Sequence, residues 1–176
     1  LLLFITTIVA WAQNPFITEI YTADPTARVF GNTLYVYPSH DVEGCSEDQG
    51  DNSYCMPDYH VYSTEDLTNW TDHGVILDQN EVPWGKKDAY GMWAPDCIEK
   101  NGTYYYYFPG PPADSTAFRR IGVATSSSPT GPFNIEPHPL PNIDAIDPGL
   151  YKDEDGKVFI YYAVGGKLKG AQLLSL

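Results

Sequence analysis

Two aspartates that each precede a proline are the residues of this chain best suited to chemistry. Asp24 is followed by Pro25 and Asp147 by Pro148. Because proline restricts the residue before it to an extended backbone, each carboxylate is expected to be held in one direction. Two carboxylates that converge on one place can take part in general acid and general base catalysis. A single Asp-Pro pair commonly does no more than start a strand, so a catalytic role requires that the two pairs lie together.

A repeated β-hairpin pattern provides the frame that would bring the two aspartates together. Each copy contains a short strand opened by proline, a tight turn with Gly and Asn or Asp, and a strand rich in aromatic residues, which is typical of a β-hairpin. The copies begin at Asp24, Ala94 and Asp147. Ala94 thus takes the place of the aspartates in the second copy, and a small residue there leaves room for a pocket.

A second pattern alternates with the hairpins and completes a repeating unit of four strands. It consists of a strand, a turn rich in Ser and Thr, and an aromatic residue that starts another strand, and it occurs at 59–70, at 121–133 and in part at 169–175. Trp70 and Phe133 occupy equivalent positions, so both are expected to pack between units. Four-stranded units repeated in this way indicate the blades of a β-propeller, the alternative being a β-sandwich with chance similarity.

In a propeller the two aspartates would share one location. The first strand of each blade lines the central channel, so Asp24, Ala94 and Asp147 would meet at one mouth of it. The sequence holds two complete units and most of a third, whereas propellers close with roughly four to eight blades. We therefore expect an all-β chain that forms about the first three blades of a longer protein.

Composition and charge favour a β protein that binds neutral molecules. The 15 Gly and 15 Pro among 176 residues argue against helical bundles and coiled coils, and the hydrophobic fraction of 43% argues against disorder. The formal net charge of −13 would repel nucleic acid and anionic lipid surfaces. Neither is expected as a partner, and the sequence does not indicate an oligomeric state.

The first 12 residues predict export. They are apolar and uncharged, and they are fewer than the roughly 20 residues that a transmembrane helix needs. They end in Ala10-Trp11-Ala12, which fits a signal-peptide cleavage site. A buried N-terminal strand is the alternative. We expect a secreted, periplasmic or extracellular protein in which 1–12 is an N-terminally clipped signal peptide and 13–176 is the partial propeller domain.

Three cysteines are compatible with export, but their odd number leaves one without a partner in this chain. Cys45 and Cys55 flank an acidic, polar loop, and the sequence leaves open whether they form a disulfide. Cys97 is the third. No CxxC motif occurs and the Cys and His residues do not have the spacing of a zinc site, so no metal ligand is assigned.

Five short motifs, taken in order, carry a resemblance to a known family. They are Asp24-Pro25, Ser39-His40-Asp41, Trp93-Ala94-Pro95-Asp96, Ile146-Asp147-Pro148 and Asp153-x-Asp155-Gly156. Their order and spacing resemble glycoside hydrolase family 43. The resemblance implies a five-bladed propeller and inverting hydrolysis of plant cell-wall glycosides, mainly β-xylosides and α-L-arabinofuranosides. The expected partner is a xylo- or arabino-oligosaccharide or polysaccharide.

The resemblance also implies a role for each aspartate. Asp24 matches the general base, which activates water for attack at the anomeric carbon, and Asp147 matches the aspartate that orients the general acid and tunes its pKa. The family's general acid is a Glu of the fourth blade, and no Glu of this chain matches it. We therefore expect these 176 residues alone to be inactive. No cofactor is expected to be required, and a calcium ion in the channel of the full protein is compatible with the family.

Four further residues are predicted to contact the sugar. Trp93 would stack on a sugar face, with packing between blades as the alternative. His40 and Asp41 would reach sugar hydroxyls, with a structural histidine as the alternative for His40, and Ile146 completes the set. A non-catalytic carbohydrate-binding propeller is the alternative function, although binding alone does not require paired aspartates. Fructan-cleaving propeller enzymes start from Asn-Asp-Pro rather than from the Ala-Asp-Pro found here.

Overall fold

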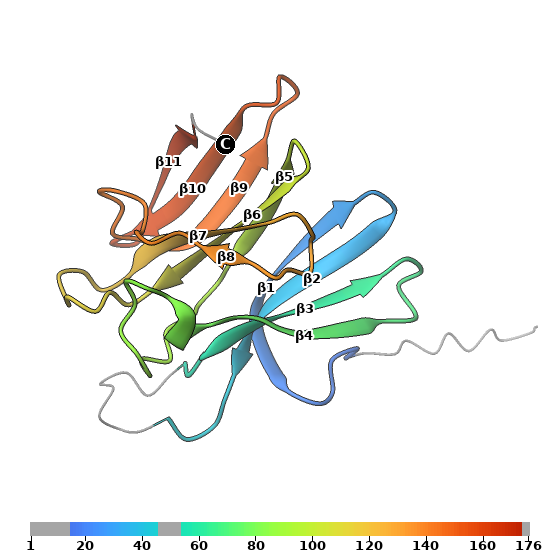
Figure 1. Cartoon of the computed structure of the whole chain (residues 1–176), viewed down its shortest axis with the longest axis horizontal. Helices are drawn as coiled ribbons and strands as arrows, with labels where there is room; N and C mark the ends of the chain where they lie inside the picture. The colour runs from blue at the N-terminus through green and yellow to red at the C-terminus, as the bar shows by residue number, and fades with distance from the viewer. Residues whose placement is uncertain (1–14, 46–53, 174–176) are drawn as a thin grey trace, which may run out of the picture.

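The chain folds into three β-sheets, and the described residues contain no α-helix. The computed structural model describes residues 15–45 and 54–173, so the predicted signal peptide at 1–12 lies outside the described residues. Figure 1 shows the three sheets arranged in a fan, from the blue and green first sheet to the red third sheet. We call them blade 1, blade 2 and blade 3.

Each blade is an antiparallel meander in which every strand pairs with the next one along the chain. Blade 1 contains β1 (Tyr21–Phe30), β2 (Thr33–Asp41), β3 (Asp58–Thr64) and β4 (Thr71–Asp78). Blade 2 contains β5 (Asp96–Lys100), β6 (Thr103–Gly110), β7 (Arg120–Ser126) and β8 (Asn134–Ile135). Blade 3, as described, contains β9 (Ile146–Lys152), β10 (Val158–Val164) and β11 (Lys167–Leu173). A short 3₁₀ helix, η2 (Gln79–Glu81), follows β4. The order of hairpin, strand and strand is the one that the sequence predicts.

Two of the tight turns show why the sequence forms hairpins at these places. Asn101 and Gly102 join β5 to β6, and Gly165 and Gly166 join β10 to β11; all four residues have positive φ angles. Two consecutive residues with positive φ match the right-handed twist of the flanking strands, and Gly and Asn adopt this conformation at the least cost.

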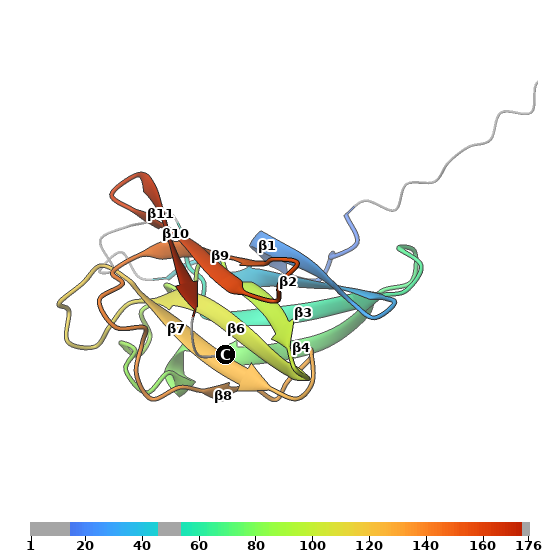
Figure 2. The ribbon, with the colours of Figure 1, turned by 90° about the horizontal axis from the view of Figure 1, so that it is seen from above.

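The inner strands β1, β5 and β9 meet through one buried carboxylate. Asp96 of β5 accepts hydrogen bonds from the Thr26 hydroxyl at 2.7 Å, from Arg28 Nε at 2.9 Å and from the Leu150 backbone N–H at 2.6 Å. Arg28 also donates to the Leu150 carbonyl at 2.9 Å. Figure 2 shows the inner strands running alongside one another where the blades converge. Charged and polar contacts therefore tie the first strands of all three blades together.

Two apolar clusters fill the spaces between neighbouring blades. Between blades 1 and 2 the fully buried residues include Tyr37, Tyr59 and Tyr106, and between blades 2 and 3 they include Tyr107 and Ile160. Tyr106 and Tyr107 are consecutive residues of β6, and successive side chains of a strand point to opposite faces. The tyrosine-rich strand 103–110 therefore packs against both neighbours.

The two equivalent aromatic residues of the repeat have different partners. Phe133 lies 5.4 Å from Tyr106, centre to centre, and packs against the cluster between blades 1 and 2, as predicted. Trp70 stacks at 3.8 Å on Phe16, which belongs to the segment before β1. The described contact of Trp70 is thus with that segment rather than with a neighbouring blade.

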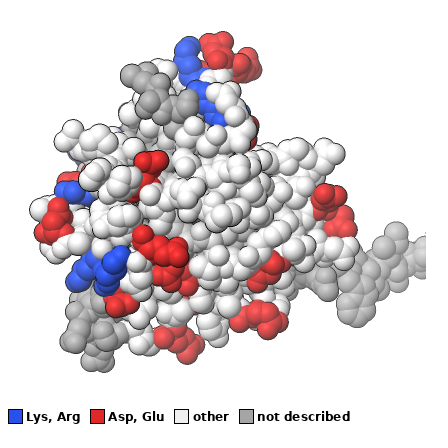
Figure 3. Space-filling model, viewed as in Figure 1, with Lys and Arg blue, Asp and Glu red and all other residues white. Residues whose placement is uncertain are grey.

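Cys45 and Cys55 form a disulfide with their Cα atoms 5.9 Å apart, which settles the pairing that the sequence leaves open. Cys97 is a free thiol in the core. None of the described residues belongs to a helix long and apolar enough to cross a membrane. Figure 3 shows acidic side chains spread over the visible face and basic ones in few places, as the net charge of −13 leads one to expect.

Candidate active site

Asp24 and Asp147 occupy equivalent positions in blades 1 and 3. Each lies near the start of an inner strand, at a place where the strand pairing shifts register. Both have positive φ angles, +46° for Asp24 and +54° for Asp147. The prediction that proline holds each aspartate in an extended conformation is therefore wrong. The register shift accounts for the difference, since an extra residue in one strand leaves the ladder and its side chain is aimed in a new direction.

The two carboxylates are close enough to interact. Burial raises the pKa of Asp147 above its usual value, and the negative charge of Asp24 raises it further. Both side chains keep access to solvent. Ala94 lies in the segment that leads into β5, so blade 2 adds no carboxylate at the equivalent position. Two of the three blades thus bring an acid to one site, as the repeat predicts.

A pocket of about 480 Å³ opens beside Asp147. Its wall combines blade 3 with the loop that leads into β7 of blade 2. The residues that line it are Phe118, Arg119, Asp144, Ala145, Ile146, Asp147 and 163–166. A largely apolar wall with a few charged groups is typical of a site for a small molecule.

Trp93 lines a second, narrower pocket of about 210 Å³. The two pockets adjoin, because Phe118 and Arg119 line both. The Arg119 guanidinium carbon lies 4.2 Å from the centre of the Trp93 ring and 4.3 Å from that of Phe118. The Tyr59 hydroxyl donates a hydrogen bond of 2.6 Å to the Trp93 carbonyl. Trp93 is therefore held at the edge of the site and packs against the cluster between blades 1 and 2. Its stacking on a sugar face stays a prediction.

Sequence reasoning missed Tyr59, Phe118 and Arg119. Burial raises the pKa of Tyr59, Arg119 opposes this rise, and Asp24 adds to it, so Tyr59 lies within electrostatic reach of both charged groups. The one signal in the sequence is the pair Arg119-Arg120 directly before a strand, in a chain with only 10 basic residues.

The other predicted sugar contacts occupy different places. Ile146 lines the larger pocket next to Asp147. Asp41 ends β2 opposite Tyr21 and is half-buried. His40 lines neither pocket; its Nδ1 lies 3.0 Å from a carboxylate oxygen of Asp58. Contact of these residues with a sugar stays a prediction.

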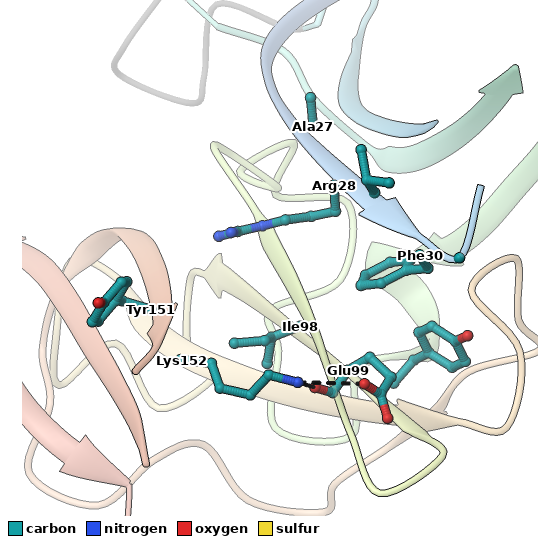
Figure 4. A pocket seen from close by; sticks show the side chains of 10 residues that line it. Ala27, Arg28, Phe30, Ile98, Glu99, Tyr151 and Lys152 are labelled. Atoms are coloured by element: carbon teal, nitrogen blue, oxygen red, sulfur yellow. Dashed lines mark hydrogen bonds and ion pairs between the residues drawn. The ribbon is translucent and has the colours of Figure 1, made fainter. Parts of the chain in front are cut away.

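A cavity of about 500 Å³ lies at the opposite end of the inner strands. Figure 4 shows Arg28, Ile98, Glu99, Tyr151 and Lys152 around it, with Lys152 bonded to Glu99. Its charged groups are paired with one another or with Asp96, and neither Asp24 nor Asp147 lines it. The cavity beside Asp147 is therefore the better candidate for catalysis.

The fold and the site define a β-propeller with an acidic pair at one end of its channel. The family model of glycosyl hydrolases family 43 matches residues 12–174. This chain belongs to that family, whose solved members among its structural neighbours are five-bladed propellers.

Several proteins similar to this chain have names that describe a common activity. The chain is 46% identical to xylosidase/arabinosidase 43A of Humicola insolens over 90% of its own length, and 43% identical to a xylosidase/arabinosidase of Bacteroides ovatus over 87%. A β-xylosidase/α-arabinofuranosidase from a compost metagenome, solved with xylotriose in a calcium-free form, matches 82% of the chain at 45% identity with a TM-score of 0.72.

The chain spans less than half the length of these proteins. It covers 47% of the Humicola insolens enzyme, 46% of the Bacteroides ovatus enzyme and 43% of the compost enzyme. The three blades described here therefore correspond to part of the propeller in each relative.

Proposed function

We propose that this chain is the N-terminal part of a secreted, inverting glycosidase that releases xylose or arabinose from plant cell-wall polysaccharides or oligosaccharides. The observation that carries the proposal is the pairing of Asp24 with Asp147 at equivalent places in two blades. The names of the relatives support xylosides and arabinofuranosides as the substrate class.

In this mechanism Asp24 is the general base. It removes a proton from a water molecule as the water oxygen forms a bond to the anomeric carbon. The bond from that carbon to the leaving oxygen breaks, and a general acid gives this oxygen a proton. Base and acid in such reactions stand roughly 6.5–9.5 Å apart so that the water fits between base and sugar. The acid is a Glu that, in our proposal, belongs to a later part of the protein.

Asp147 has a supporting role. Because partial burial and, to a smaller extent, the negative charge of Asp24 raise the pKa of Asp147, this carboxyl holds its proton more tightly than an isolated one. In the proposed enzyme its charge orients the general acid and raises the pKa of that acid in turn. A calcium ion in the channel of the full protein stays a prediction.

The test uses the full-length protein with aryl β-xylosides and aryl α-L-arabinofuranosides. Asp24→Asn should lower kcat by about 10²–10⁴, the usual contribution of a general base. Asp155→Asn, in the exposed turn between β9 and β10, serves as control and should retain activity. Undiminished hydrolysis by Asp24→Asn would remove the general-base assignment. A wild-type protein that binds xylo-oligosaccharides but hydrolyses none would instead indicate a binding propeller.

Proton NMR of the first product tests the stereochemistry. Inversion predicts that a β-xyloside releases α-xylose before mutarotation, whereas β-xylose as the first product would contradict it.

Sequencing the N-terminus of the mature protein tests export: cleavage after Ala12 predicts that it starts at Gln13. A mature protein that retains residues 1–12 would contradict the prediction that these residues are a signal peptide.

A further inference from the structure

Blade 1 contains a cluster of two histidines and one aspartate that the proposed reaction does not use. His40 lies on β2, and Asp58 and His60 lie on the neighbouring strand β3. His40 Nδ1 lies 3.0 Å from Asp58 Oδ1, and His60 Nε2 lies 3.5 Å from the same oxygen. Asp58 and His60 are buried. None of the three lines the pocket beside Asp147.

The spacing of these atoms fits a single metal ion. One ligand atom from each side chain can be chosen so that all three lie within 4.8 Å of one another. In a tetrahedral site with metal–ligand bonds of about 2.0–2.1 Å, neighbouring ligand atoms are about 3.3 Å apart. The separations of 3.0 and 3.5 Å between the two histidine nitrogens and Asp58 Oδ1 lie on either side of that value. The antiparallel pairing of β2 with β3 places the three side chains next to one another.

A further carboxylate lies beside the cluster. The second nitrogen of His60 faces a carboxylate oxygen of Asp72 at 3.8 Å. Metal-binding histidines commonly direct their second nitrogen toward a carboxylate in this way.

We propose that His40, Asp58 and His60 bind one divalent transition-metal ion, with Zn²⁺ as the representative, at a site separate from the sugar pocket. Two imidazoles and one carboxylate suit such ions better than they suit Ca²⁺ or Mg²⁺, which prefer oxygen ligands. The His40 side chain is 22% exposed, so a water molecule can reach a fourth position. The bound ion would link β2 to β3 and stabilise blade 1.

The experiment measures zinc binding by the full-length protein. The protein is stripped with a chelator, titrated with ZnCl₂ by calorimetry, and analysed for metal content after dialysis. Asp58→Asn and His60→Gln should each lose one equivalent of Zn²⁺ relative to wild type. His73→Gln is the matched control: this exposed histidine on β4 contacts Ser63 instead of the cluster, and its variant should bind as wild type does.

Two further measurements separate this site from others. Added Zn²⁺ should raise the Tm of wild type and His73→Gln but not that of Asp58→Asn, because an ion that binds the folded state stabilises it. The calorimetric response to CaCl₂ should be the same in wild type and Asp58→Asn. Equal zinc content in wild type and Asp58→Asn, or no zinc uptake by wild type, would overturn the proposal.

A third measurement covers the case in which the variants do not fold. X-ray absorption of zinc-loaded wild type should show two imidazole nitrogens and oxygen ligands around the ion. A sulfur ligand or an environment of oxygen alone would contradict this site. All of these readouts are independent of hydrolysis, so their failure is distinguishable from a failure of the proposed glycosidase function.

Discussion

At the scale of single residues, the aspartate pair combines catalytic potential with a cost in stability. Asp24 and Asp147 both take a left-handed backbone conformation, which non-glycine residues rarely adopt. Burial raises the pKa of Asp147 and the negative charge of Asp24 raises it further, so the folded protein disfavours the ionised form of Asp147. Strain and like-charge contacts of this kind are common at functional sites.

The repulsion predicts how stability depends on pH. The folded-state pKa of Asp147 lies above its usual value of 3.8. At a pH below 3.8 the Asp147 carboxyl is mostly protonated, so its unfavourable charge is absent. The stability of the protein then decreases as pH rises from there through the raised pKa. Asp147→Asn should raise the unfolding free energy near pH 7, by no more than about 1 kcal/mol because both carboxylates are exposed and screened.

Denaturant unfolding at several pH values checks this prediction. The gain in unfolding free energy of Asp147→Asn should vanish near about pH 3, where the Asp147 carboxyl is largely protonated in the folded and in the unfolded state. Asp155→Asn, at the other end of β9, should show no gain that depends on pH. A gain of equal size at every pH would mean that repulsion from Asp24 is not its cause.

At the scale of elements, two glycines in strands differ in how closely other side chains approach them. Gly122 lies on β7, and a Cβ atom added there would come within 2.5 Å of Phe108 and 2.7 Å of Trp84. Gly149 lies on β9 with no atom within 4 Å of its added Cβ. The two positions have the same residue type in similar elements but differ in packing.

This difference predicts opposite responses to alanine. Gly122→Ala should lower the unfolding free energy by about 1–3 kcal/mol, since both aromatic rings must move to admit the methyl group. Gly149→Ala should be close to neutral or slightly stabilising, because alanine restricts the unfolded chain. Chemical denaturation of the two variants of the full-length protein measures both effects. Equal losses of unfolding free energy in the two variants would show that contact with the aromatic rings is not what makes position 122 sensitive to alanine.

At the scale of the whole molecule, Asp96 joins the three blades. It receives hydrogen bonds from β1 and β9 while it belongs to β5, and it is buried. A buried carboxylate with this many donors is costly to alter, because the donors lose a charged partner. Asp96 is the last residue of the motif Trp93-Ala94-Pro95-Asp96, so part of that motif holds the three blades together.

Asp96→Asn should therefore lower the unfolding free energy by about 2–3 kcal/mol. Glu99→Gln is the control: Glu99 also links β5 to β9, through Lys152 at 3.4 Å, but this pair is partly exposed. Glu99→Gln should lower the unfolding free energy by less than about 1 kcal/mol. Thermal and denaturant unfolding of both variants measure the contrast. A loss in Asp96→Asn no larger than in the control would show that the three blades do not depend on Asp96.

The sequence alone determined the sheet architecture and the pairing of the two aspartates. Proline, turn residues and aromatic strands act locally, so their repetition reveals hairpins, and equivalent positions in a repeat must lie at equivalent places in space. Successive side chains of a strand point to opposite faces, which accounts for the tyrosine-rich strand β6, whose residues pack in the clusters on both sides.

Only the tertiary structure decided what depends on contacts between distant residues. The register shifts that turn Asp24 and Asp147 into a left-handed conformation, the stacking of Arg119 on Trp93, and the Cys45–Cys55 bond all involve partners that no local pattern specifies. His40 and His60 show the same limit: 20 positions separate them in the sequence, yet the antiparallel pairing of β2 with β3 places both beside Asp58. Local chemistry fixes the elements, whereas the packing of elements against one another decides which side chains meet.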